Sequence, residues 1–326
     1  MSNFWKEFTG PVFSLAPMED VTDTVFREIV LGMAAPGKLH VVFTEFTSVE
    51  GMNHPVGRPR VSERLIVNDS ERELLQTMNV KLVAQIWGRS PEIYNKIARH
   101  LTENYQFDGI DINMGCPVKK VVKQGACSAL IGEPSLAKEI ISATKEGTHL
   151  PVSVKTRTGI KQHQTEDWIS QLLEVEPAAI ILHGRTQRMQ SEGNADWNEI
   201  AKAVQLKNQL DLSIPLHGNG DVFTFTDGLK KIEETGVSGV MVGRGIFQNP
   251  WFFNPEKTEI SKEERIEKLL QHTRLFEQTW GGRKNFNILK RFYKIYLNSF
   301  DGAAKMRADL MEVKNFSEVY SYFKIG

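Results

Sequence analysis

The chain has 326 residues, of which 40% are hydrophobic and 25% are charged, and this composition predicts a soluble globular protein. Its 40 basic residues balance its 40 acidic residues, so the net charge neither demands nor excludes a nucleic-acid partner. The two cysteines, Cys116 and Cys127, are too few for a disulfide framework or a tetrahedral zinc site, and no metal is expected. The sequence contains no signal-peptide pattern and no apolar stretch of about 18 residues, so we expect a cytoplasmic protein.

Eight short apolar runs recur through the first three quarters of the chain. They cover residues 12–18, 41–46, 81–88, 109–115, 151–159, 178–185, 214–221 and 239–245. Most of the stretches between them are typical of helices, for example residues 91–105, 134–147 and 165–176. Strands that alternate with helices indicate parallel pairing through right-handed crossovers. Eight such units predict an α/β protein with a (β/α)8 TIM barrel, and a doubly wound open sheet is the alternative.

Polar residues stand at the carboxyl end of nearly every run. They are Glu19, Glu45, Gln85, Asn113, Cys116, Lys155, Arg157, His183, Arg185, Asn219, Asp221 and Arg244. A strand with only a structural role would end in turn residues, without repeated amides, cations and imidazole. In a (β/α)8 barrel these ends converge on one face and form the active site. The pattern therefore favours the barrel over the open sheet.

The pattern changes near residue 250, where QNPWFFNPEK (248–257) carries two prolines that break the chain. Residues 257–280 predict an amphipathic helix with Ser261 as its N-cap, and further helical stretches follow. We expect a catalytic barrel domain over residues 1–250 and a smaller all-helical domain over residues 251–326.

A basic segment with interleaved aromatic residues lies at 282–296. Its cations are Arg283, Lys284, Lys290, Arg291 and Lys294, with no acidic residue among them. One interpretation is a surface that contacts nucleic-acid phosphates. The alternative is a solvated basic helix face above an aromatic core stripe.

Two glycine-rich stretches, HGNGD (217–221) and VGRG (242–245), end the last two runs. In barrels the loops after strands seven and eight often bind a phosphate through backbone N–H groups, and Arg244 would add a bidentate cation. The alternative is that these glycines only make tight turns. Neither stretch matches a dinucleotide-binding fingerprint, so a Rossmann nicotinamide domain is not supported.

The polar set Gln85, Lys155, His183 and Asn219 has the chemistry to hold the ring of a flavin. Amides pair with the mixed donors and acceptors of the ring, and a lysine stabilises the negative charge that builds up on reduction. An ion pair of Lys155 with a carboxylate such as Glu45 or Asp111 is the alternative. For His183 the alternative is a hydrogen-bonded core histidine.

Cys116 stands between Gly115 and Pro117 at the end of a predicted strand. A free cysteine has a pKa of about 8.5, so it is mostly protonated near neutrality and suits the role of a general acid. The alternatives are a nucleophile with His183 as its base, and a small buried hydrophobic residue. Cys127 is expected only to pack.

Six motifs occur in the order found in one enzyme family. They are LAPMEDVTD (15–23), DINMGCPVKKV (111–121), VSVKTRTG (152–159), HGRT (183–186), GNGD (218–221) and VGRG (242–245). The chain resembles a bacterial-type tRNA-dihydrouridine synthase over residues 12–250. The resemblance implies an FMN-bearing barrel followed by a helical RNA-binding domain. It also implies that NADPH reduces FMN, that hydride passes to C6 of a D-loop uracil in tRNA, and that a cysteine protonates C5.

The resemblance assigns roles to residues of this chain. Cys116 is the implied proton donor. The implied FMN ligands are Pro17, Met18, Glu19, Gln85, Lys155, His183, Asn219, Gly220, Asp221, Gly243 and Arg244. The implied substrate contacts are Asn113, Arg157 and Arg185, followed by Arg283, Lys284, Lys290, Arg291 and Lys294 for the tRNA. The chain departs from the family at Cys127, where many members carry glycine, and at Met189 and Ser191 in the loop 187–192.

Two other functions compete with a tRNA-dihydrouridine synthase that acts as a monomer. One is a flavin-dependent barrel oxidoreductase for a small molecule, similar to dihydroorotate dehydrogenase. The basic aromatic segment and the HGRT motif argue against it. The other is a non-catalytic RNA-binding barrel, and the presence of Cys116 and Lys155 argues against that.

Overall fold

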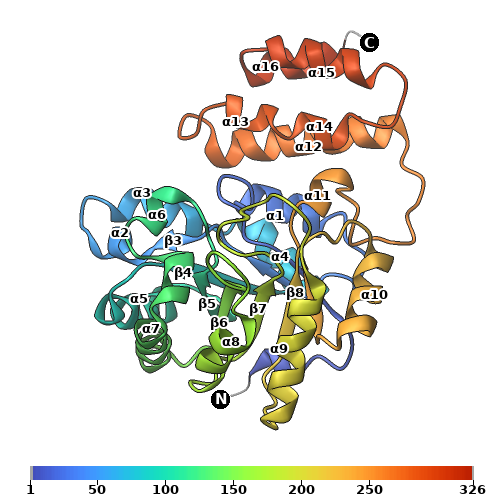
Figure 1. Ribbon diagram of the computed structural model, residues 1–326. Coiled ribbons are helices and arrows are strands. Elements are labelled where there is room, and N and C mark those ends of the chain that lie inside the picture. Colours follow the sequence, from blue (N-terminus) through green and yellow to red (C-terminus); the bar gives the residue numbers. More distant parts are fainter. Residues whose placement is uncertain (1–2, 325–326) are drawn as a thin grey trace.

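The structure is a computed structural model that describes residues 3–324 (Figure 1), so residues 1–2 and 325–326 of the two predicted domains lie outside it. Eight parallel strands form a ring. They are β1 (Val12–Leu15), β2 (Val41–Phe43), β4 (Lys81–Trp87), β5 (Gly109–Met114), β6 (Val152–Arg157), β7 (Ile180–His183), β8 (Leu216–Asn219) and β9 (Gly239–Val242). The ring closes because β2 pairs with both β1 and β4, and β1 also pairs with β9. The predicted barrel is confirmed, and the open sheet is wrong.

Helices surround the barrel, and short helices lie in the loops at its carboxyl end (Figure 1). The longer ones are α1 (Thr24–Leu31), α4 (Asp69–Met78), α5 (Pro91–Asn104), α7 (Pro134–Gly147), α8 (Thr165–Leu173), α9 (Trp197–Gln209) and α10 (Phe225–Thr235). The shorter elements are η1 (Phe4–Lys6), β3 (Thr47–Ser48), α2 (Val49–Asn53), α3 (Arg58–Ser62), η2 (Glu63–Leu65), α6 (Lys119–Val122), η3 (Cys127–Gly132) and α11 (Gly245–Gln248). Side-chain caps begin several helices, since Asp23 accepts from Phe26 N and Ser90 from Ile93 N.

The strands read as apolar runs because most of their side chains are buried, toward either the barrel interior or the helices. The polar residues that interrupt these runs cluster at the carboxyl ends. This distribution leaves the lower part of the barrel as packed core and the upper end for chemistry.

From residue 251 to residue 324 the chain contains helices and no strand. These are α12 (Lys262–Trp280), α13 (Asn287–Lys290), α14 (Tyr293–Tyr296), α15 (Ala303–Glu312) and α16 (Phe316–Lys324). Ser261 caps α12 by accepting from Glu264 N, as predicted. The helical stretch expected after α12 is split into the two single-turn helices α13 and α14.

These helices stack above α1 and α11 (Figure 1). Phe292 stacks on Phe26 of α1, with 5.2 Å between the ring centroids, and His272 of α12 also contacts Phe26. One continuous apolar core therefore extends from the barrel into the helices. None of the helices between residues 3 and 324 combines the length and the hydropathy needed to span a lipid bilayer.

Candidate active site

A cavity of about 180 Å³ opens at the carboxyl end of the barrel, where five strand ends meet. The predicted site residues that line it are Pro17, Met18, Lys155, Arg157, His183, Arg185, Asn219, Gly220, Asp221, Gly243 and Arg244. Four of these side chains are cations, whereas Asp221 is the acid among them. The cavity is therefore suited to an anionic ligand.

Lys155 and Asn219 are joined across the cavity floor. Lys155 Nζ donates to Asn219 Oδ1 at 3.0 Å, and Asn219 Nδ2 donates to the carbonyl of Met241 at 2.8 Å. Within the described residues, Lys155 makes this bond and no ion pair with Glu45 or Asp111. Burial, reinforced by the charge of Arg157, lowers the pKa of Lys155 to about 8.

His183 lies among the same cations and stays neutral. Burial and then the charges of Arg157 and Lys155 hold its pKa well below its usual value. Its ring nitrogen Nε2 lies 3.4 Å from Arg185 Nη1. A neutral imidazole at this point can donate or accept a hydrogen bond, but it is not a source of charge.

The loop after β8 holds the acid of the cavity. Gly220 has φ +123°, and a β-carbon there would lie 2.5 Å from the β-carbon of Ala195, so only glycine fits. Asp221 follows and accepts from Arg185 Nη2 at 2.6 and 2.8 Å and from Arg244 Nη2 at 2.7 Å. These two arginines hold the pKa of Asp221 below its usual value, although burial acts in the opposite direction and is the largest single influence.

Cys116 is held by a chain of buried amides and acids. Asn113 Oδ1 accepts from the backbone N–H of Cys116 at 2.9 Å, and Asn113 Nδ2 donates to Gln85 Oε1 at 3.0 Å. Gln85 in turn donates to Asp111 Oδ2 at 2.7 Å, and Ser153 donates to Asp111 Oδ1 at 2.6 Å. Gln85 and Asn113 were predicted to face flavin and uracil, and in the structure both amides also bond to each other in this chain.

The Cys116 thiol is partly exposed and is a stronger acid than an ordinary cysteine. Contact with the Cys127 thiol is the largest influence, and with the backbone N–H of Val118 it lowers the pKa of Cys116 to about 7 against the opposing effect of burial. Arg157 contributes a favourable charge, and its Nε donates to the carbonyl of the neighbouring Gly115 at 2.7 Å. Because Arg157 also lines the cavity, the thiol lies beside the cavity wall.

Two arginines hold the loop that follows β7. Arg157 Nη1 donates to the carbonyls of Thr186 and Gln190, and Arg185 donates to those of Glu192 and Gly193. Arg185 is 2% exposed, so its predicted substrate contact competes with this structural role. Hydrogen bonds from these two arginines thus hold the atypical loop 187–192 against the site.

Sequence reasoning missed Ser128. Its hydroxyl donates to the carbonyl of Cys116 at 2.7 Å and accepts from Gln187 Nε2 at 3.0 Å, which connects Cys116 to the loop after β7. Nothing in the local sequence marks this serine, because its partners are 12 and 59 residues away.

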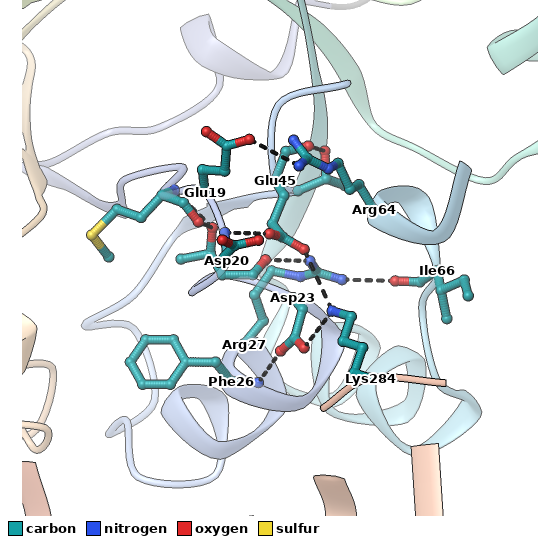
Figure 2. A network of polar contacts seen from close by, with 12 residues as sticks. Glu19, Asp20, Asp23, Phe26, Arg27, Glu45, Arg64, Ile66 and Lys284 are labelled. Carbon is teal, nitrogen blue, oxygen red and sulfur yellow. Dashed lines mark hydrogen bonds and ion pairs between the residues drawn. The ribbon is translucent and has the colours of Figure 1, made fainter. Parts of the chain in front are cut away.

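The loop after β1 is clamped between the barrel and the helices (Figure 2). The N–H of Asp20 donates to Glu45 Oε1 at 2.6 Å, and Arg291 donates to the carbonyl of Asp20 at 2.9 Å. Lys284 Nζ lies 3.1 Å from Asp23 Oδ2 and 3.9 Å from Glu45 Oε2. Glu19, predicted to bind the cofactor, points outward and pairs with Arg64 at 2.8 Å (Figure 2).

The basic segment 282–296 is therefore not one continuous face. Lys284 and Arg291 contact the barrel, and Lys290 donates to the carbonyl of Met311 at 2.6 Å. Arg283, Arg291 and Lys294 are exposed, and Arg283 also donates to the carbonyl of Thr279 and packs on the ring of Trp280. Arg283 and Lys294 are the two exposed cations that make no contact with the barrel.

A closed parallel barrel with a cation-lined cavity at its carboxyl end is the architecture of a TIM-barrel enzyme that binds an anionic molecule there. The family model described as dihydrouridine synthase matches residues 14–323. The chain belongs to the dihydrouridine synthase family.

Curated relatives agree with this assignment. The chain is 40% identical over 318 residues to a protein of Staphylococcus aureus (strain COL) named probable tRNA-dihydrouridine synthase, covering 97% of this chain and 93% of the relative. It is 40% identical over 319 residues to probable tRNA-dihydrouridine synthase 2 of Bacillus subtilis (strain 168), covering 97% and 94%.

A solved structure supports the fold. The chain aligns with 6-hydroxypseudooxynicotine amine oxidase from Pseudomonas geniculata N1 with a TM-score of 0.56 and 13% identity. The alignment covers 77% of this chain and 48% of the other, so the chain spans about half the length of that structure. At this identity the likeness concerns the architecture alone.

Proposed function

We propose that the protein reduces the C5–C6 double bond of a D-loop uridine in tRNA, with FMN as its bound cofactor and NADPH as reductant. The observation that carries this proposal is the cavity at the carboxyl end of the barrel, where buried cations with few acidic partners adjoin an acidic thiol. The family supports the same reaction.

The residues that line the cavity fit FMN. Lys155 is a half-buried cation without a carboxylate partner among the described residues, which suits a flavin ring whose reduced form is anionic. Gly220 and Gly243 line the cavity without a side chain, and Arg244 is half exposed beside them, as expected of a phosphate site. His183 and Asn219 supply neutral hydrogen-bonding groups, and Pro17 and Met18 supply an apolar wall.

FMN, when bound, supplies the hydride that is added to C6 of the uracil. The protein supplies the proton. Cys116 delivers it to C5, and the contacts that lower its pKa to about 7 stabilise the thiolate left behind. Arg157 lies close enough to Cys116 to favour that thiolate, and its remaining N–H groups are available to a uracil carbonyl. Asn113 also positions the Cys116 backbone, and Gln85 holds Asn113; each amide nitrogen keeps a second N–H for the predicted contacts with uracil and flavin.

Residues 251–326 act in this proposal as a separate helical domain that binds tRNA, attached to the catalytic domain 1–250. The helices α12 to α16 and the exposed charges of Arg283 and Lys294 support it. The contacts of Lys284 and Arg291 fix the helices against the loop after β1, so that bound tRNA would be presented to the barrel mouth. The protein acts as a monomer.

The proposal is tested with the purified full-length protein and an unmodified tRNA transcript. We expect a yellow protein that releases FMN on denaturation, is reduced by NADPH, and converts uridine in the D-loop to dihydrouridine detectable by mass spectrometry. A colourless protein that binds tRNA without converting it would contradict the proposal. A yellow protein that reduces a small enone but not tRNA would instead support an oxidoreductase of small molecules.

A further inference from the structure

The two cysteines of the chain, 11 residues apart in the sequence, meet in the structure. The backbone N–H and the hydroxyl of Ser128 both donate to the carbonyl of Cys116, at 3.3 and 2.7 Å. These bonds hold the start of η3 against the loop that carries Cys116. They bring the two cysteines side by side, near enough for each thiol to shift the pKa of the other.

Cys127 occupies an unusual position. It is 0% exposed, and its φ of +54° lies in the left-handed region, which disfavours residues with a β-carbon. A cysteine that only packed in the core would not need this unfavourable backbone conformation. The conformation places the Cys127 sulfur beside Cys116, the proposed proton donor.

The two cysteines differ in their exposure to solvent. Cys116 is partly exposed beside the cavity, and Cys127 is fully buried behind it. Their contact lowers the pKa of Cys116 to about 7, whereas burial and that same contact raise the pKa of Cys127. Near neutrality a large fraction of Cys116 is thus thiolate, which is the form that peroxides oxidise, while Cys127 remains a thiol.

We infer that Cys116 and Cys127 are an oxidation site, at which a peroxide forms a reversible intrachain disulfide that stops proton transfer to the uracil. The effect on turnover rests on the proposed role of Cys116, whereas the disulfide itself does not. Cys116 is the attacked residue and Cys127 the resolving residue of the pair.

The chemistry balances with hydrogen peroxide as the oxidant. The Cys116 sulfur attacks one peroxide oxygen, the O–O bond breaks, and Cys116 becomes a sulfenic acid while one water is released. The Cys127 sulfur then attacks the Cys116 sulfur, the S–S bond forms and the S–O bond breaks. The Cys127 proton leaves with the hydroxyl group as a second water. The two thiols have lost two electrons and two protons, and a dithiol reductant reverses the step.

The resolving thiol also protects the site. A sulfenic acid without a neighbouring thiol is oxidised further to sulfinic acid, which ordinary thiols do not reverse. Because Cys127 already lies beside Cys116, it captures the sulfenic acid before a second peroxide reacts. The enzyme would lose activity during oxidative stress and recover it afterwards.

The test uses the full-length protein loaded with FMN and treated with limiting hydrogen peroxide, which catalase then removes. We expect the intact mass to fall by two hydrogen atoms, both cysteines to resist alkylation, and tRNA reduction to stop. Dithiothreitol should restore the mass, the alkylation and the turnover together. Peptide mapping should find residues 116 and 127 joined.

Two variants remove the resolving thiol. Cys127→Gly suits the positive φ, and Cys127→Ser keeps the size of the side chain, so at least one is expected to fold. In both, we expect Cys116 to gain two oxygen atoms at the peroxide dose that gives a disulfide in the natural chain, and dithiothreitol not to restore turnover.

The inference is overturned if the natural chain accumulates sulfinic acid on Cys116 as fast as Cys127→Gly does, with no disulfide. A disulfide in a protein whose reduced form does not convert uridine would overturn the proposed function and its regulation, but would leave the disulfide established. Uridine conversion by a protein that forms no disulfide would overturn the inferred oxidation site and leave the proposed function established.

Discussion

Two groups of buried charge lie near the carboxyl end of the barrel, and they differ in their partners. Between α1 and α4, Arg27 and Glu71 are both 0% exposed and bond to each other at 2.6 and 2.9 Å. Arg27 also donates to the carbonyls of Thr22 and Ile66, and Thr24 donates to Glu71. Both charges of this pair, which we call the seam, therefore have an oppositely charged partner within the protein.

At the barrel mouth the charges are only partly matched. Arg185 and Arg244 share Asp221, whereas Lys155 and Arg157 have no carboxylate partner among the described residues. Burial lowers the pKa of Lys155 to about 8 and that of Arg157 to about 10. An unmatched buried cation costs free energy that an anionic ligand would recover. We therefore expect removal of one charge of the Arg27–Glu71 pair to lower the free energy of unfolding. Substitutions at the barrel mouth should instead affect ligand binding and catalysis.

The largest effect is expected at the mouth, from Cys116→Ala. Loss of a general acid slows the chemical step by about 10²- to 10⁴-fold. We expect tRNA reduction to fall by that factor while FMN content, reduction by NADPH and the melting temperature stay near those of the natural chain. Single-turnover assays with reduced enzyme would measure it. Full turnover on natural tRNA would remove Cys116 from the mechanism.

At the seam, Arg27→Ala should act on stability instead. It leaves the Glu71 carboxylate buried without its cation, which costs about 3–5 kcal/mol. Urea denaturation of the cofactor-free protein would measure the loss. The matched control is the double variant Arg27→Met with Glu71→Leu, which removes both charges and should cost much less. Equal losses in the single and the double variant would disprove the reading of the seam as a matched pair.

Lys155→Met should make the cofactor-free protein more stable and bind FMN more weakly. The pKa of Lys155 is lowered from 10.5 to about 8 in the folded protein, so the unfolded chain binds more protons between these values. The penalty is complete below pH 8, amounts to at most about 3 kcal/mol, and is lost as the pH rises toward 10.5.

Denaturation of both proteins at several pH values checks this sign. Between pH 8 and pH 10 the natural chain should gain stability relative to Lys155→Met, because only the natural chain carries the titrating amine. If Lys155→Met were less stable than the natural chain at pH 7, the charge of Lys155 would be compensated by other groups of the folded protein, and the prediction would be wrong.

The smallest effect is expected on the helices. Glutamate at Arg283 and Lys294 should weaken tRNA binding and reduce the slope of log affinity against log salt by about one for each lost phosphate contact. Lys230→Glu on α10, where the side chain is 68% exposed, makes the same charge change as either single substitution and serves as the control for each. If the control weakened binding equally, the helices would hold no special phosphate site.

The barrel and its mouth could be predicted from the sequence because a parallel barrel leaves little choice. Once the eight runs are strands, their carboxyl ends must meet, and Lys155, His183 and Asn219 meet as expected. Gln85 and Asn113 also stand at strand ends, and they bond to each other. The bond from Gln85 to Asp111, 26 residues away, could not be predicted, because no local pattern encodes such a partner.

The helices were harder to predict in detail. The concentration of Arg283, Lys284, Lys290, Arg291 and Lys294 indicated either a phosphate-contacting surface or a solvated basic helix face. The segment instead forms two single-turn helices, and its cations bond to different parts of the protein: Lys284 and Arg291 to the barrel and Lys290 to α15. These partners lie far away in the sequence, so no local pattern could predict them.

The pairing of β1 with β9 constrains how the protein can be made. Val12 pairs with Gly239 and Leu15 with Val242, so the first strand cannot complete its hydrogen bonds until the last one has left the ribosome. During most of synthesis an apolar strand edge stays open to other chains. Such long-range closure is slow, and the nascent chain therefore depends on cellular protection against aggregation. Truncation before residue 239 would leave a fragment with unpaired strand edges that aggregates, rather than a smaller enzyme.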